Sequence, residues 1–310
     1  MVTPLVSICI PTYKKPDYVF RCLQSIAKQD YKNIEVIITD DSPDESIKQV
    51  AVQFNELTIQ YTHNKIPLNS PANWNSAIRK ANGDLFMLLH QDDWLHATNA
   101  ISLFVNAFTT GVYFVFGYNI GIDEKGTVIN FQKNNVIPDL SAFPEQLIIR
   151  NVIGPPSNVM MHKSIHQRYD EALIWLVDID YYIAILKRDY KYHYLKEHLV
   201  SIGIHEDQTT AFVKKHTSII LKENLLLAIK IKDAPFSNIA LYDYYWRLLR
   251  NRNIHSFEQV EALGLDLNLI PRFIKHMISF QNRFGKRILK IGVVSKMAMA
   301  ISYVHTRLMK

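Results

Sequence analysis

Two pairs of adjacent carboxylates stand directly after apolar runs in this 310-residue chain. Asp40-Asp41 follows the run at 34–39, and Asp92-Asp93 follows the run at 85–89, with His90 and Gln91 between. Short unbroken apolar runs predict strands that are buried on both faces. Carboxylate oxygens suit Mg²⁺ or Mn²⁺, and open α/β sheets bind ligands at the carboxyl ends of their strands. Either pair alone is more typical of a turn or a helix start, but together they predict a ligand site.

The elements around these pairs alternate along the chain. Further apolar runs lie at 6–10 and 57–61, and a segment with helical spacing of apolar residues follows each of the first three runs. Strands that alternate with helices predict a mostly parallel sheet, in which all carboxyl ends share one edge. Pro11, Thr12 and Tyr13 should therefore meet both carboxylate pairs in one crevice. Such a crevice suits a nucleotide base and ribose on one side and a metal-bound diphosphate on the other.

Two more polar residues border apolar segments later in the chain. Asp178 opens a segment of helical spacing, where it either complements the helix dipole or serves as a general base. His205 follows the apolar run at 199–204, and a lone histidine there is more often structural than a ligand. The runs at 112–118 and 127–131, joined by a turn, predict a hairpin that ends the parallel alternation.

The composition is that of a folded protein, with 48% hydrophobic and 21% charged residues. The two cysteines, Cys9 and Cys22, stand among apolar residues and predict buried free thiols rather than a disulfide. The amino terminus lacks the basic region and long apolar stretch of a secretory signal, so we expect a cytoplasmic chain. No pattern indicates a nucleic-acid-binding module.

The last third of the chain is almost continuously helical in pattern and differs in charge. Nine of the 35 basic residues follow Asp266, and no acidic residue does. One apolar stripe recurs at helical spacing: Val293, Met297, Ile301, Val304 and Leu308. No run reaches the roughly 18 uncharged apolar residues of a membrane span. Such a stripe more often packs on neighbouring helices, and the alternative is an interfacial helix on an anionic surface, peripheral to the inner face of the plasma membrane.

With these residues assembled, residues 4–212 resemble the family 2 glycosyltransferases of the GT-A fold. Five segments carry the resemblance, in the family's order: VSICIPTYKK, NIEVIITDDSPDES, NWNSAIRKANGDLFMLLHQDDW, WLVDIDYYIAILKR and SIGIHEDQTT. The resemblance implies an α/β catalytic domain over residues 1–214, with a Rossmann-like, mostly parallel sheet flanked by helices. An α-helical region would follow over residues 215–310.

The same resemblance implies an inverting enzyme that uses a nucleoside diphosphate sugar, with a UDP-sugar favoured. The acceptor would be a glycan or a lipid-linked hydroxyl compound, as in bacterial-type surface polysaccharide or glycolipid synthesis. Two other functions stay open: a nucleotidyltransferase, although no glycine-rich phosphate loop follows the first run, and a non-catalytic module that binds nucleotide sugars or membranes.

Individual residues also take implied roles. The nucleoside and donor contacts would be Pro11, Thr12, Tyr13, Asp40, Asp41, Asn75 and His90, with Asp41 reading the base. The ligands of Mn²⁺ or Mg²⁺ would be Asp92, Asp93 and His205. Asp178 would be the catalytic base. Three positions depart from the family's pattern. His90 replaces the first acid of its Asp-x-Asp motif, Val177 stands where a glutamate often precedes the catalytic acid, and Gly203 replaces an arginine that is common two residues before His205.

Overall fold

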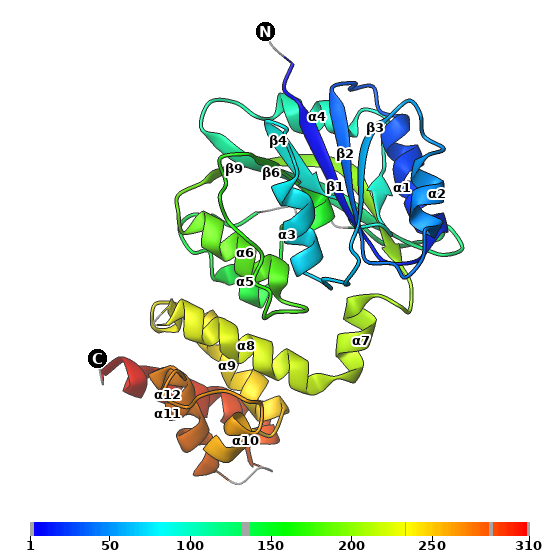
Figure 1. The fold of residues 1–310 in the computed structure, drawn as a ribbon. Coiled ribbons are helices and arrows are strands. Elements are labelled where there is room, and N and C mark those ends of the chain that lie inside the picture. Colours follow the sequence, from blue (N-terminus) through cyan, green and yellow to red (C-terminus); the bar gives the residue numbers. More distant parts are fainter. Residues whose placement is uncertain (1–2, 132–136, 233, 285–287, 309–310) are drawn as a thin grey trace. The chain divides into compact units, whose positions relative to one another are not determined.

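The computed structural model describes residues 3–131, 137–232, 234–284 and 288–308, which form two compact units (Figure 1). The sheet unit comprises residues 1–144 and 151–208, and the helical unit comprises residues 145–150 and 209–310. Lys286, Arg287 and Lys310, which belong to the basic tail of the sequence, lie outside the described residues.

One sheet organises the sheet unit, and its strands follow the order β3-β2-β1-β4-β8-β6-β9-β5, with β7 beside β6. The described strands are β1 (Val6–Thr12), β2 (Ile34–Asp40), β3 (Thr58–His63), β4 (Leu85–Leu88), β5 (Trp94–Leu95), β6 (Val112–Asp123), β7 (Val128–Phe131), β8 (Val159–His162) and β9 (Lys191–Ile204).

The first four strands pair in parallel, as the sequence predicted. β1 lies between β2 and β4, with Thr12 opposite Asp40 and Cys9 opposite Leu88. β3 pairs with the outer side of β2. The carboxyl ends of β1, β2 and β4 therefore meet at one edge of the sheet.

The second half of the sheet reverses direction twice. β8 runs antiparallel to both β4 and β6, so β6 points the same way as β4. β9 pairs with β6 in parallel over most of its length, and the short β5 runs antiparallel to β9. The predicted hairpin is confirmed, because β7 pairs antiparallel with β6. These directions bring the end of β9 to the same edge as the ends of β1, β2 and β4.

Helices cover both faces of this sheet, because its inner strands are apolar on both sides. α1 (Pro16–Ala27), α2 (Ser46–Ala51) and α4 (Ala100–Asn106) pack against the face that presents Val6, Ile8 and Ile10. α3 (Ala72–Arg79) and α6 (Val177–Leu186) lie on the opposite face of the sheet (Figure 1). The mixed α/β, GT-A-like fold predicted from the sequence is confirmed.

The helical unit consists of α5 (Gln146–Ile149), α7 (Thr209–Lys215), α8 (Thr217–Ile231), α9 (Ile239–Asn251), α10 (Phe257–Glu261), α11 (Arg272–Asn282) and α12 (Gly292–Leu308), with 3-10 turns η2 (Ala234–Phe236) and η3 (Ile288–Lys290). Its core contains large aromatic side chains, among them Tyr242, Trp246 and Phe273. Within the described part of the chain, no helix has both the length and the apolar character that crossing a bilayer requires. Cys9 and Cys22 are buried free thiols, as predicted.

Candidate active site

The loop between β4 and β5 carries His90, Asp92 and Asp93 at the shared sheet edge. Together with His205, these residues are called the acidic centre below. One ligand atom from each of His90, Asp92 and Asp93 lies within 4.8 Å of the others. His205, directly after β9, places its Nε2 atom 2.9 Å from Oδ2 of Asp92. The structure thus brings together four of the residues that the sequence proposed for donor or metal binding.

Burial and neighbouring charge set different protonation states within this cluster. Burial alone would raise the pKa of Asp92, but the hydrogen bond from His205 and the adjacent imidazoles outweigh it and hold that pKa below its usual value. Burial lowers the pKa of His90, which leaves a neutral imidazole at pH 7. Burial and the charge of Asp92 raise the pKa of Asp93 well above its usual value. Asp92 is therefore the more readily ionised of the two carboxylates.

Asp93 has a structural partner that Asp92 lacks. Its Oδ1 atom accepts a hydrogen bond from the backbone N–H of Gly203 at 3.0 Å, which ties the β4–β5 loop to β9. The approach is so close that a Cβ atom on Gly203 would lie 2.4 Å from the carbonyl oxygen of Asp92. Only glycine fits here, which explains why this chain has no side chain at the position where the family commonly has arginine.

A guanidinium group nonetheless lies beside Gly203, and it comes from α1. Arg21 donates from Nη2 to the carbonyl oxygen of Asp92 at 2.8 Å, and its guanidinium lies 3.9 Å from the centre of the Trp94 ring. Stacking of this kind holds an arginine in one orientation. Arg21 thus fixes the backbone that presents the Asp92 carboxylate. The role of Arg21 was not predicted from the sequence, because a single arginine on an amphipathic helix does not stand out in the pattern.

Asp40 and Asp41, at the carboxyl end of β2, are both buried. Asp40 accepts hydrogen bonds from the Thr12 hydroxyl at 3.0 Å and the Tyr61 hydroxyl at 2.7 Å. Asp41 accepts hydrogen bonds from Asn64 Nδ2 and from two backbone N–H groups of the loop that follows β3. Each of these four carboxylate oxygens already has a partner within the protein, so both residues shape this loop.

Tyr13 connects the end of β1 to the β4–β5 loop. Its backbone N–H donates to Oε1 of Gln91 at 2.9 Å, and Nε2 of Gln91 donates back to the carbonyl oxygen of Tyr13 at 3.1 Å. The Tyr13 ring is half exposed, whereas Pro11 is buried opposite Thr39 in the β1–β2 ladder. Gln91 was also missed, although it occupies the middle position of the acidic motif.

Asn75 is less closely associated with the edge than the resemblance implied. Its side chain is buried and exchanges hydrogen bonds of 3.0 and 2.9 Å with the backbone N–H and carbonyl of Tyr169. The neighbouring Trp74 ring lies 4.7 Å from the His90 ring and 5.3 Å from the Tyr169 ring. The contact between Asn75 and the donor that the resemblance implies stays a prediction.

Asp178 stands in the first turn of α6, where the sequence placed it. Asn151 donates from Nδ2 to Oδ2 of Asp178 at 2.7 Å, which orients the carboxylate. Tyr181, also in α6, stacks on Tyr169 with ring centroids 4.2 Å apart. Through Tyr169 and Trp74, α6 is therefore connected by ring contacts to His90.

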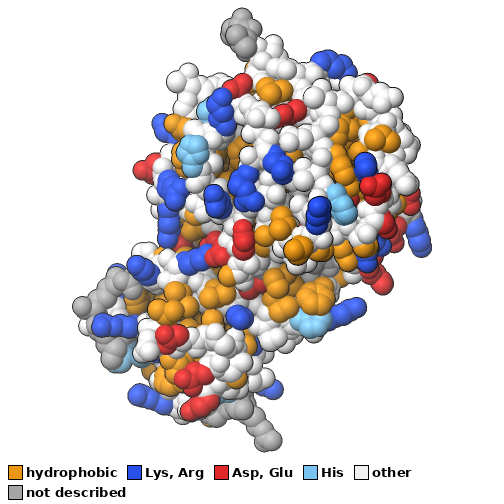
Figure 2. Space-filling model, viewed as in Figure 1, with side chains coloured by type: hydrophobic (Ala, Val, Ile, Leu, Met, Phe, Trp, Pro, Cys, Tyr) orange, Lys and Arg blue, Asp and Glu red, His pale blue; other side chains and the backbone are white. Residues whose placement is uncertain are grey.

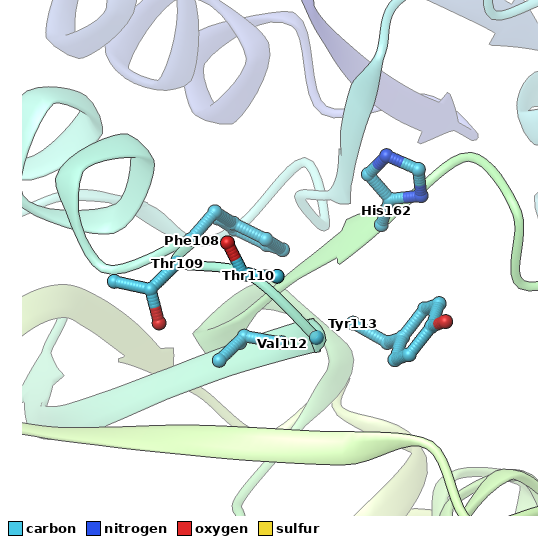
Figure 3. Close-up of a pocket in the computed structure, with 7 residues that line it drawn as sticks. Phe108, Thr109, Thr110, Val112, Tyr113 and His162 are labelled. Carbon is cyan, nitrogen blue, oxygen red and sulfur yellow. The ribbon is translucent and has the colours of Figure 1, made fainter.

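Two hollows lie on the sheet unit. One, of about 230 Å³, is lined by Tyr18, Arg21, Ile122, Asp123, Glu124, Gly203, Ile204 and His205 and therefore adjoins the acidic centre. The other, of about 390 Å³, is lined by Phe108, Thr109, Thr110, Gly111, Val112, Tyr113 and His162 (Figure 3). It lies where β6 begins and β8 ends, which is the opposite edge of the sheet, and His162 is the one titratable imidazole or carboxylate group in its lining.

The acidic edge of this mixed α/β sheet is the candidate active site of the described residues. The sequence model described as "Glycosyl transferase family 2" matches residues 7–170, more than half of the chain, and the chain belongs to this family.

Two relatives show how far the sequence similarity extends. The GalNAc(5)-diNAcBac-PP-undecaprenol beta-1,3-glucosyltransferase of Campylobacter jejuni is 23% identical over 307 residues, which cover 94% of this chain and 98% of that protein. An uncharacterized glycosyltransferase of Rickettsia felis is 27% identical over 256 residues, and the match spans 75% of this chain but only 41% of that protein.

Solved structures share the fold. S. aureus TarS 1-349 in complex with UDP-GlcNAc aligns with a TM-score of 0.61 at 15% identity, over 98% of this chain and 92% of that one. The mannosyltransferase PcManGT from Pyrobaculum calidifontis, in complex with GDP-Man and Mn²⁺, aligns with a TM-score of 0.57 at 14% identity, over 99% of this chain and 88% of that one.

Proposed function

We propose that this glycosyltransferase moves a sugar from a nucleoside diphosphate sugar to an acceptor hydroxyl with inversion, and that a UDP-sugar is the donor. The observation that carries the proposal is the placement of His90, Asp92 and His205 at the same sheet edge as Thr12 and Asp41. A donor that spans this edge would put its nucleoside on one side and its diphosphate on the other. The nucleotide sugars bound in the two solved structures, UDP-GlcNAc and GDP-Man, support this class of donor.

The residues of the acidic centre fit a divalent cation. Nε2 of His90 is buried without a hydrogen-bond partner, and a neutral imidazole with an unused nitrogen lone pair is a ready metal ligand. Asp92 supplies an ionised carboxylate, and Asp93 and His205 complete the surroundings. We propose Mn²⁺ or Mg²⁺ as the cofactor, with Mn²⁺ preferred because an imidazole donor suits it better than Mg²⁺.

A divalent cation held by these residues would supply positive charge opposite the leaving diphosphate. The protein residues do the rest. Asp178, held by Asn151, would accept the proton from the acceptor hydroxyl as its oxygen attacks the anomeric carbon. Arg21 and Gly203 hold the loop that presents Asp92. A single in-line displacement of this kind inverts the anomeric centre.

We further propose that residues 1–214 act as the catalytic domain and that the acceptor is a glycan or a lipid-linked glycan at the inner face of the plasma membrane. The Campylobacter relative, whose name specifies an undecaprenol-linked acceptor, supports this class of acceptor. Bacterial-type surface polysaccharide or glycolipid synthesis would be the process served. Residues 215–310 would then form an accessory helical region rather than part of the donor site.

The test is a panel of UDP-, GDP- and dTDP-sugars, measured by thermal stabilisation of the full chain with and without Mn²⁺. We expect one nucleotide class to raise Tm only when Mn²⁺ is present. Product analysis by NMR with that donor should then show an inverted anomeric configuration. Pyrophosphate release from a nucleoside triphosphate, without any response to nucleotide sugars, would replace the proposal with nucleotidyl transfer.

A further inference from the structure

α12 turns its apolar stripe toward solvent. The five stripe residues are exposed: Val293 by 71%, Met297 by 62%, Ile301 by 58%, Val304 by 55% and Leu308 by 81%. At 3.6 residues per turn they fall within an arc of about 80° on the helix. Ile288 and Ile291, just before the helix, are exposed as well, so seven of the nineteen exposed large hydrophobic residues in the described chain lie between 288 and 308.

The opposite face of α12 is the one that packs. Its buried residues are mostly small or hydroxyl-bearing, and Ser302 and Thr306 both hydrogen bond with the Tyr242 hydroxyl at 2.8 and 3.0 Å. Trp246 donates from Nε1 to the Ser295 hydroxyl at 3.1 Å. The favoured interpretation of the stripe, packing on neighbouring helices, is therefore wrong for these residues. α12 thus packs mainly through small and hydroxyl-bearing side chains and exposes its apolar stripe.

Positive charge borders the exposed stripe. Lys296 and Arg307 are exposed along one flank, His305 along the other, and Lys290 precedes the helix. No acidic residue occurs after Asp266 to neutralise them. Figure 2 shows hydrophobic side chains at the surface of the helical unit close to Lys and Arg side chains. An apolar strip flanked by cations is complementary to a bilayer surface with anionic headgroups.

We propose that residues 288–308 dock flat on an anionic membrane surface, with the stripe in the headgroup boundary and the flanking cations against lipid phosphates. A second copy of the chain fits less well, because stripe-to-stripe contact would bring Lys296 and Arg307 of both copies together without acidic partners. A spanning arrangement is excluded by the hydrogen bonds that hold Ser302 and Thr306 against Tyr242. Long basic side chains can reach headgroups while the apolar face is immersed.

This docking surface rests on the proposed function only for the identity of the acceptor. A membrane contact would bring the enzyme to lipid-linked acceptors and would keep it there between turnovers. Binding to vesicles requires no sugar, nucleotide or metal, so its failure and the failure of the transferase proposal are separate results.

The experiment is co-sedimentation of the full chain with phosphatidylcholine vesicles, with and without phosphatidylglycerol. We expect binding to the anionic vesicles only, and a loss of binding as salt rises to about 0.5 M, where the screening length is a few ångströms. Ile301→Glu should lower the partition coefficient roughly tenfold or more, because it removes one buried aliphatic side chain from the contact. Lys296→Gln combined with Arg307→Gln should lower it roughly twentyfold.

Matched controls separate this surface from general effects of charge. Leu269→Glu changes an equally exposed residue of the same unit, and Lys28→Gln with Lys125→Gln removes the same charge from the sheet unit. All of these positions are exposed, so Tm should be unchanged in every variant, and both controls should bind vesicles like the parent chain. Equal binding to neutral and anionic vesicles, or undiminished binding of Ile301→Glu, would overturn the proposal. So would a dimer in sedimentation velocity that Ile301→Glu dissolves, without any vesicle binding.

Discussion

The Nε2 atom of His205 and Oδ2 of Asp92 lie 2.9 Å apart, although 113 positions separate the two residues in the chain. Their meeting depends on two reversals of direction in the sheet, at β8, which bring β9 parallel to β4. The same topology carries the Gly203 backbone to Asp93. The acidic centre thus combines the loop after β4 with residues at the end of β9, and substitutions in either segment should affect it.

Asp92→Asn should abolish Mn²⁺ binding and sugar transfer while changing the free energy of unfolding by less than about 1 kcal/mol, since this side chain is partly exposed. Asp93→Ala provides the contrast. It removes the buried acceptor of the Gly203 N–H and should cost about 1–3 kcal/mol of stability. Calorimetric Mn²⁺ titration and urea unfolding of both variants measure these effects. Unchanged Mn²⁺ affinity in Asp92→Asn would remove this residue from the metal site.

His90 tests the identity of the metal. We expect His90→Ala to weaken Mn²⁺ binding at least about tenfold, and His90→Asp to make Mg²⁺ nearly as effective as Mn²⁺, because an oxygen ligand replaces nitrogen. His162→Ala, a partly buried histidine at the opposite sheet edge, is the control. Calorimetric titration with each metal in turn gives the answer, and a parent chain that prefers Mg²⁺ would contradict it.

Asp178→Asn keeps the shape of the side chain and removes its basicity. If Asp178 is the base, kcat should fall about 100-fold or more, with donor affinity nearly unchanged. Asp180→Asn, two residues further along α6, is the matched control and should retain most activity. A normal rate in Asp178→Asn with a collapsed rate in Asp180→Asn would assign the role to Asp180 instead.

Gly203→Ala tests how closely β9 approaches the acidic loop. The added Cβ would lie 2.4 Å from the Asp92 carbonyl oxygen, so the loop must shift, at a cost of about 1–3 kcal/mol. Mn²⁺ affinity should fall together with stability. Gly292→Ala meets no atom within 4 Å and should leave both unchanged. Parent-like Mn²⁺ affinity in Gly203→Ala would show that the loop adapts without consequence.

Glu35 links stability to pH at the opposite edge of the sheet. Burial raises its pKa, but hydrogen bonds from Ser7, Asn82 and Gly83 outweigh this and hold the pKa below its usual value. A lowered pKa in the folded chain stabilises it above the unfolded-state pKa, and that stability is lost as pH falls through the folded-state value. Glu35→Gln should therefore cost about 1 kcal/mol at pH 7 and much less below about pH 4. Urea unfolding at several pH values measures the difference, and a cost independent of pH would contradict it.

The sequence was sufficient to predict the parallel half of the fold and the convergence of its polar ends. The mainly apolar segments before Asp40 and Asp92 are short and separated by helical segments, and this pattern has few other solutions. Asp92, Asp93 and His205 could be proposed as partners for the same reason, with the help of the family resemblance. Their measured proximity agrees with that hypothesis, while their roles stay predictions.

Other features depend on contacts that no local pattern contains. The position of antiparallel β8 between β4 and β6 depends on contacts between residues far apart in the sequence. The hydrogen bond from Arg21 of α1 to the Asp92 backbone does so too. The sequence of α12 predicted an apolar face, but not that this face is exposed to solvent. The packed side of this helix includes Ser302 and Thr306, whose hydroxyls pair with Tyr242, and such residues do not stand out in a hydrophobic pattern.

The paired amide hydrogen bonds between Tyr13 and Gln91 have a consequence for engineering donor specificity. They couple the end of β1 to the β4–β5 loop. A chimera that replaces only the end of β1 would leave the Gln91 side-chain amide opposite backbone groups that are not placed to bond with it. Exchanging both segments together would preserve the coupling. Chimeras between relatives should therefore be cut after Gln91 rather than after Tyr13.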